Sequence, residues 1–332
     1  MHKRTVATRI VGFCLGGTIL LLLPLVVRND YVLRVANMML IYSMLSLGLN
    51  LTTGFAGQLS LGHAAFYGIG AYSTAILALR LSLPFPWTLL CSAVIACIFG
   101  LLLGIPTLRV AGDYLCIVTI GFAEIVRLVF LNWMSLTRGP MGLPGVPPAQ
   151  LFSFVFLDNR SYYYLFLVLA SATLFVIWRI VGSQIGRAFI AIREDPIAAS
   201  AMGVSIVYYK ILAFAIGAFF AGIAGSCFAH YLMFVGPNSF NVDESLIMLQ
   251  TVILGGLGSI PGCLLGTAII VVLPELFRPI YMYRMLWSGI LLIMLMLWKP
   301  QGIMGKVTLG HLVRRNKLFA SLKSKAVGLM RK

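Results

Sequence analysis

Charge is scarce in this 332-residue chain. Charged residues make up 10% of it, only nine residues are Asp or Glu, and hydrophobic residues make up 60%. Ordinary soluble domains carry about 25% charged residues. A water-exposed surface cannot be built from so few charges, which excludes a typical soluble domain. The composition therefore predicts an all-α, polytopic integral membrane protein whose main solvent is lipid.

Motifs for nucleotide binding and catalysis are also missing. There is no GxxxxGK[ST] phosphate loop, and the nearest string, "PQGIMGKV", has the wrong spacing. Neither HExxH, a nucleophile elbow nor a kinase motif occurs. The six cysteines show no metal-ligand spacing. We therefore expect a non-catalytic chain that binds no metal, no ATP and no other cofactor itself.

The net charge of +16 would suggest a nucleic-acid partner in a soluble protein. In a membrane protein it is better interpreted as loop charge that fixes orientation, so no nucleic-acid partner is expected. The Lys and Arg residues favour a cytoplasmic N-terminus and C-terminus, chiefly because of the basic tail at 306–332. That tail either lies against anionic lipid headgroups or is simply solvated.

Apolar runs long enough to cross a bilayer predict about ten transmembrane helices within a permease domain at residues 1–305. The eighth and ninth runs are short and separated by "GGLGSIPG", so a total of eight or nine stays open. The predicted spans are 9–27, 33–52, 59–79, 87–106, 113–133, 162–181, 210–234, 244–257, 262–277 and 284–298.

Two long connections separate these spans. Residues 134–160 are dense in Gly and Pro and are expected on the outer side, whereas residues 182–209 are expected in the cytoplasm. The second connection contains "IREDPIAASAMGV", in which Asp195 can cap a short helix, Pro196 fits its first position and Gly203 its end. A seven-residue helix is unstable alone, which indicates a docking element.

Polar residues within the predicted spans are the remaining candidates for function. The densest set either joins helices by hydrogen bonds or lines a pathway, and comprises Asn50, Gln58, Ser60, His63 and Tyr67. Glu124 and Arg127 are three residues apart, so they can pair on one helix face. That pair is either structural or part of a proton or substrate relay.

Glycine-rich interruptions suggest an inverted internal repeat. The stretches "GFAGQLSLGHAAFYGIGA" and "GGLGSIPGCLLGTA" resemble one another and would fall in two five-span units of opposite orientation. Transporters often place interrupted helices at corresponding points of two halves, near the substrate path.

Five stretches, in order along residues 33–305, resemble permease subunits of bacterial branched-chain amino acid ABC importers, the LivM type. They are "NLTTGFAGQLSLGHAAFYGIGAY", "TRGPMGLPGVP", "GRAFIAIREDPIAASAMGVSIVYYKILAFAIGAFFAGIAG", "TVILGGLGSIPG" and "WKPQGIMG". The resemblance implies a type II ABC-importer-like permease in the bacterial inner membrane. It also implies a second homologous permease, two ATP-binding subunits, and a periplasmic binding protein that delivers leucine, isoleucine or valine.

The resemblance further implies that Gly186–Gly203 is the segment that couples to an ATP-binding subunit, while 134–160 helps to receive the binding protein. Family members often have acidic residues where this chain has Pro196 and Ser200, so this chain departs from the family's pattern at these two positions. Three charged residues are expected to set the position of this segment against the ATP-binding subunit, namely Arg193, Glu194 and Asp195. The face that packs against the subunit is expected to comprise Ile197, Ala198, Ala201 and Met202.

Two alternatives to this function remain. Importers of urea and short-chain amides use similar permeases, so the same architecture could carry a different cargo. An autonomous secondary transporter would need its own coupling site, for which Glu124 and Arg127 are the only charged pair in the middle of a span.

Overall fold

The computed structural model describes residues 29–276 except 109, 111, 152 and 153. It also describes Pro24 and the positions 289, 290, 293, 294, 297, 299 and 301–304. The predicted first span at 9–27, apart from Pro24, and the tail at 306–332 therefore lie outside the described residues. So does most of the predicted last span at 284–298.

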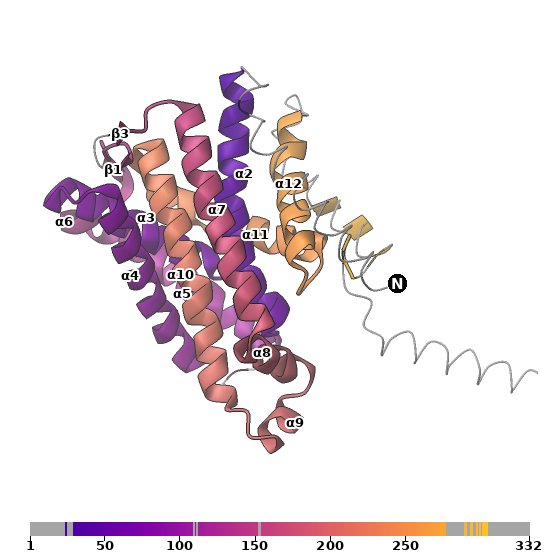
Figure 1. Ribbon diagram of the computed structural model, residues 1–332. Coiled ribbons are helices and arrows are strands. Elements are labelled where there is room, and N and C mark those ends of the chain that lie inside the picture. The colour runs from indigo at the N-terminus through magenta and orange to yellow at the C-terminus, as the bar shows by residue number, and fades with distance from the viewer. Residues whose placement is uncertain are drawn as a thin grey trace, which may run out of the picture.

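Six helices in the described part are long and apolar enough to cross a membrane, and they form one bundle (Figure 1). The chain is thus a multi-pass helical protein, as its composition predicts, although a total of ten spans is not confirmed. The six are α2 (Asp30–Leu49, continued by the π-helix η1 at Asn50–Phe55), α3 (His63–Leu81), α4 (Phe85–Thr107), α5 (Asp113–Asn132), α7 (Asn159–Gly182) and α10 (Ile206–Leu232).

The predicted eighth and ninth spans correspond to two shorter helices, α11 (Val242–Gly255) and α12 (Ile260–Leu276). At 1.5 Å per residue they extend ~21 and ~26 Å, whereas the hydrocarbon layer is ~30 Å thick. They form a hairpin whose backbones are nearly in contact, since a β-carbon at Gly255 would lie 2.1 Å from the Gly262 carbonyl oxygen. The hairpin packs along α2.

Helix α10 is the central element of the bundle and packs most extensively against α4 and α3. Small residues make this packing close: a β-carbon at Gly70 of α3 would lie 2.6 Å from Cα of Gly222 in α10. A β-carbon at Gly100 of α4 would lie 2.8 Å from the Phe214 carbonyl oxygen. Within a membrane, where apolar side chains gain little by leaving lipid, such close backbone contact is a main source of helix association.

The two long connections lie at opposite ends of the bundle (Figure 1). One end carries α8 (Gln184–Glu194) and α9 (Pro196–Ala201). The other carries α6 (Met134–Thr137), the 3-10 helix η2 (Gly139–Met141) and four two-residue strands, a small departure from a purely helical fold. Strand β1 (Leu143–Pro144) pairs with β4 (Phe234–Val235), and β2 (Gln150–Leu151) pairs with β3 (Phe154–Val155).

Candidate functional site

The predicted short helix in the 182–209 connection is present as α9. The Asp195 carboxylate accepts hydrogen bonds from the backbone N–H groups of Ile197 and Ala198, at 2.9 and 3.1 Å, so it caps the helix as expected. Pro196 occupies the first helical position, and Gly203 has φ +83, a left-handed conformation that suits glycine at a helix end. The spacing of cap, proline and glycine was sufficient to locate this element.

The predicted packing face of α9 is exposed. Ile197 is 82% exposed and Met202 is 85% exposed, and Ala198 and Ala201 are also exposed, while Ala199 is buried against the rest of the chain. These large apolar side chains lie on a connection rather than on a membrane-spanning helix. Ile197 and Met202 therefore form a small exposed apolar surface outside the membrane-spanning helices.

The helix before α9 was not expected from the sequence. Ser183 caps α8 through its hydroxyl, which accepts a hydrogen bond from the Ile185 N–H at 3.2 Å. Arg193 lies in the last turn of α8, where one edge of its guanidinium pairs with Glu194 at 2.7 Å. The other edge donates to the Gly54 carbonyl at 2.7 Å. Arg193 therefore contacts the membrane-spanning part of the chain as well as its neighbour Glu194.

All five polar residues singled out in the spans are buried, but they differ in their contacts. Asn50 joins two elements: its Nδ2 donates to the Ser259 carbonyl at 3.2 Å, and its Oδ1 accepts from the Gly258 N–H at 2.9 Å. Ser60 accepts a hydrogen bond from the N–H of Gly62. For Asn50 the geometry supports helix–helix hydrogen bonding, one of the two interpretations left open.

Gln58, His63 and Tyr67 differ from the other two because they contain buried polar side-chain atoms with no hydrogen-bond partner in the described chain. These atoms are both amide atoms of Gln58, Nε2 of His63 and the hydroxyl of Tyr67. Such atoms are costly unless something else satisfies them. The three residues belong to one stretch of chain, the turn before α3 and the first turns of α3.

Helix α3 begins inside the bundle rather than at its end, because residues 56–62 return from the end of α2 without helical structure. The His63 ring lies in a slot between Gly48 of α2 and Gly217 of α10. Gly217 is ~16 Å along α10, a helix ~40 Å long. The predicted third span thus begins at His63 instead of residue 59, because the intervening glycine-rich residues form a turn.

Helix α11 also begins inside the bundle, at the same place. The N–H of Ala64 in the first turn of α3 donates to the hydroxyl of Ser245 in the first turn of α11, at 3.0 Å. The Asn241 side chain caps α11 by accepting from the Glu244 N–H at 3.1 Å. From this point α3 runs toward the end that carries α6, and α11 runs toward the end that carries α8. Two interrupted helices therefore meet with their N-termini at mid-depth.

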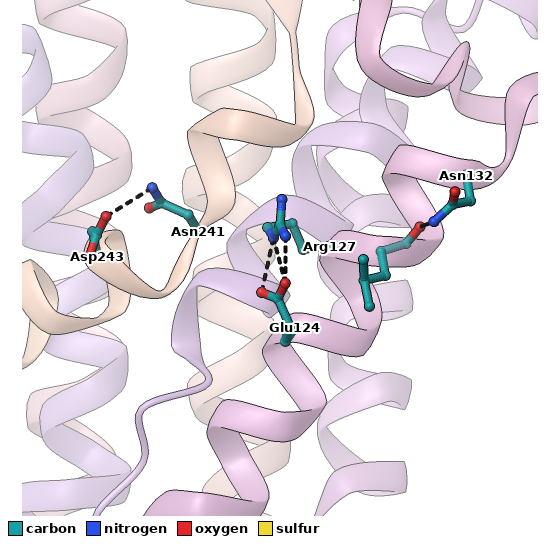
Figure 2. Close-up of polar contacts among 6 residues, drawn as sticks. Glu124, Arg127, Asn132, Asn241 and Asp243 are labelled. Atoms are coloured by element: carbon teal, nitrogen blue, oxygen red, sulfur yellow. Dashed lines mark hydrogen bonds and ion pairs between the residues drawn. The ribbon is translucent and has the colours of Figure 1, made fainter.

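The ion pair predicted on α5 is present (Figure 2). Arg127 Nε donates to both carboxylate oxygens of Glu124, at 3.1 and 2.9 Å, and an Nη nitrogen lies 2.5 Å from Oε1. The pair is partly exposed on the side of the bundle, since the Arg127 side chain is 25% exposed and that of Glu124 is 39% exposed. Helix α5 packs against the start of α11, where Asn241 and Asp243 lie.

Asn241 and Ser245 were not identified as candidates from the sequence. The string "NVDES" carries a signal that could have found them, because Asn followed by acidic residues is typical of a helix start. In this chain the helix starts within an apolar region inside the bundle, and not after a loop at the end of the bundle. Among the described residues, no group of three or more His, Cys, Asp or Glu side chains could hold a metal ion.

A multispanning bundle in which two interrupted helices meet at mid-depth, with a capped helix exposed outside the bundle, is an arrangement typical of membrane transport proteins. The chain belongs to the family described as branched-chain amino acid transport system / permease component, whose model matches residues 31–298. Such a permease component is a transport subunit and not a catalytic enzyme.

Curated relatives agree with this family. The chain is 41% identical to the high-affinity branched-chain amino acid transport system permease protein LivM of Escherichia coli (strain K12), over 81% of this chain and 69% of the relative. It is 26% identical to the probable branched-chain amino acid transport permease protein LivM of Methanocaldococcus jannaschii, over 79% and 90%. It is also 26% identical to the permease protein LivH of Escherichia coli (strain K12), over 80% and 91%. No solved structure matches the chain significantly.

Proposed function

We propose that this chain is one permease subunit of an ATP-driven importer that carries leucine, isoleucine and valine across a bacterial inner membrane into the cytoplasm. A second homologous permease would complete the pathway. Two ATP-binding subunits would supply the energy, and a periplasmic binding protein would deliver the substrate. Both termini would lie in the cytoplasm, with the basic tail at 306–332 near the membrane surface.

The observation that carries this proposal is the apolar surface of α9. ATP-driven movement in a separate subunit must act on a rigid part of the permease. A helix that is fixed by the Asp195 cap and by Pro196, and that exposes Ile197 and Met202, is suited to that role. The short helix gains stability from the partner, because two turns cannot be stable alone.

A second feature supports transport: the meeting point of α3 and α11. Helix N-termini carry partial positive charge, and interrupted helices place such ends near substrates in many transporters. Unpartnered polar atoms belong to His63 and Tyr67, in the first turns of α3, and to Gln58, in the turn before it. We propose that these residues and the Glu124–Arg127 pair line the path of the amino acid, whose ammonium and carboxylate groups need polar partners.

The inverted repeat is part of the proposal in a changed form. Helix α2 is followed by the returning turn and the interrupted α3, and α10 is followed by a turn and the interrupted α11 in the opposite direction. This correspondence pairs residues 56–62 with 233–241. The glycine-rich stretch at 255–268, which suggested the repeat in the sequence, forms the turn between α11 and α12 and the start of α12.

Partner composition is supported by the relatives. In Escherichia coli (strain K12), LivM and LivH are both named as permease proteins of a high-affinity branched-chain amino acid transport system, and this chain is similar to each. The greater identity to LivM supports the LivM position in a pair of related permeases. A urea or short-chain amide importer stays the runner-up, and the surface of α9 disfavours an autonomous secondary transporter.

The test is uptake by the reconstituted assembly in proteoliposomes, with labelled leucine and labelled urea as competing cargoes. We expect leucine uptake that requires ATP and the binding protein. Uptake of urea alone would support the runner-up, and ATP-independent uptake by this chain would support a secondary transporter.

Asp195→Lys and Gly203→Pro should abolish ATP-driven uptake and reduce the bound ATP-binding subunit, while the chain still reaches the membrane. Unchanged uptake in both variants would contradict the role of α9.

A further inference from the structure

Arg193 directly links α8, which leads into α9, to the interrupted helices. Its guanidinium donates from Nη1 to the carbonyl of Gly54 at 2.7 Å, across 139 residues of sequence. Gly54 lies in the π-helix η1 that continues α2. Carbonyls in the last turn of a helix lack partners within that helix, so a charged donor there forms a strong hydrogen bond.

Two glycines make room for this side chain. A β-carbon at Gly57, in the turn that returns from α2 to α3, would lie 2.6 Å from Cγ of Arg193. A β-carbon at Gly258, in the turn between α11 and α12, would lie 2.9 Å from its Nη1. Both glycines also have positive φ, +70 and +75. The turns that follow α2 and α11 therefore both contact the same arginine.

These turns are already fastened to each other without Arg193. Asn50 accepts from the Gly258 N–H and donates to the Ser259 carbonyl, which joins the end of α2 to the α11–α12 turn. Arg193 is thus bonded to a unit that includes both turns, and the helices of that unit lead back to the meeting point of α3 and α11. On its other edge the guanidinium holds Glu194, the residue directly before the α9 cap.

We propose that Arg193 is the positioning residue that transmits movement of α9 to the interrupted helices. This inference rests on the proposed function, because it assumes that an ATP-binding subunit moves α9. The planar guanidinium bonds Gly54 through Nη1 and Glu194 through Nη2, so its two nitrogens hold both acceptors in a fixed geometry. Without it, α9 would still bind its partner through Ile197 and Met202, but its movement would reach the interrupted helices only through the backbone and the apolar packing of α8 and α9 on the bundle.

The test compares Arg193→Gln, Arg193→Lys and Arg179→Gln in the complete assembly in proteoliposomes. Arg179 provides the control, because it is an exposed arginine in the last turn of α7, outside Gly186–Gly203, and its side chain forms no hydrogen bond or ion pair among the described residues. The quantity measured is leucine transported per ATP hydrolysed, together with the amount of ATP-binding subunit that copurifies. A role in docking alone would change the second quantity and not the first.

Arg193→Gln should keep the copurified subunit and ATP hydrolysis but reduce leucine per ATP at least about tenfold, the effect of losing one charged hydrogen bond. Arg193→Lys should fall in between, and Arg179→Gln should match the parent. A parent-like ratio for Arg193→Gln, or loss of the ATP-binding subunit from it, would overturn the inference. If the parent assembly shows no ATP-driven uptake at all, the proposed function fails, and this inference with it.

A second variant keeps the inference testable if Arg193→Gln does not reach the membrane. Gly258→Ala keeps Arg193 but places a methyl group 2.9 Å from the position of its Nη1, so the guanidinium must move. This variant should lower leucine per ATP in the same way. Gly112→Ala is its control, since Gly112 also has positive φ but no atom of the described residues lies within 4 Å of an added β-carbon. Equal ratios for these two variants would overturn the inference.

Discussion

At the scale of single residues, the Glu124–Arg127 pair is the feature that lipid would tolerate least. Charged side chains within a span are costly and normally face protein or a water-filled path. Among the described residues these two hydrogen-bond only each other, and they are partly exposed. The exposed side of α5 at this level is therefore expected to face the pathway or the second permease.

Exchanging the charges of Glu124 and Arg127 separates a role of the pair in substrate recognition from a purely structural role. Glu124→Gln should lower both uptake and thermal stability, because it leaves the arginine charge unpaired within the span. Glu124→Arg combined with Arg127→Glu restores the pair with its direction reversed. We expect its melting temperature to return toward the parent value, while the KM for leucine stays raised about tenfold, a loss of about 1.4 kcal/mol. Parent-like uptake by the exchanged pair would show that the ion pair is only structural.

At the scale of elements, the crossing of α10 with α3 and α4 depends on the absence of side chains. A β-carbon at Gly222 would meet Ala96 Cβ at 2.8 Å, the Ser92 carbonyl oxygen at 2.8 Å and Ala93 Cα at 2.9 Å. Two of these three neighbours are backbone atoms, so they cannot move aside as a flexible side chain can. Helix separation would have to increase along the whole crossing.

Gly222→Val should therefore destabilise the bundle by about 2 kcal/mol or more, and should lower its melting temperature in detergent. Gly121→Val in α5 is the matched control, since it places the same β-branched residue in a helix where, within the described part of the chain, no atom lies within 4 Å of the added β-carbon. The measurement is thermal unfolding of both purified chains. Similar melting temperatures would contradict the importance of this crossing.

At the scale of the whole molecule, the two long connections lie at opposite ends of the bundle, and this arrangement fixes which surface can meet which partner (Figure 1). The end with α9 would meet the ATP-binding subunit, and the end with residues 134–160 would meet the binding protein. The orientation of the chain in the membrane is predicted from its Lys and Arg residues chiefly because of the basic tail at 306–332. It can be measured directly.

Labelling with a membrane-impermeant maleimide would provide this measurement. Met141→Cys, at a residue that is 81% exposed, should be labelled in intact cells, and Ser200→Cys, also exposed, only after the membrane is opened. The parent chain, with its six native cysteines, gives the background. Labelling of both positions from the same side would contradict the topology, and reversed labelling would invert the assignment of partners.

The amino-acid sequence by itself determined the features that depend on composition and short spacing. Scarcity of charge fixed the membrane class, apolar runs located the six long helices to within a few residues, and the spacing of Asp195, Pro196 and Gly203 located α9. The i and i+3 spacing of Glu124 and Arg127 was enough to predict their pairing. Each of these features is local, because the interacting groups are a few residues apart.

Only the tertiary structure decided which distant segments meet. The hydrogen bond between Ala64 and Ser245 joins residues 181 apart, and that between Arg193 and Gly54 joins residues 139 apart. No spacing rule covers such distances. A polar or glycine-rich stretch looks alike in a loop and at an interrupted helix, so the start of α3 within the bundle could not be located. The cost of leaving backbone and charged groups unpaired inside the membrane selects these partners once the helices have packed.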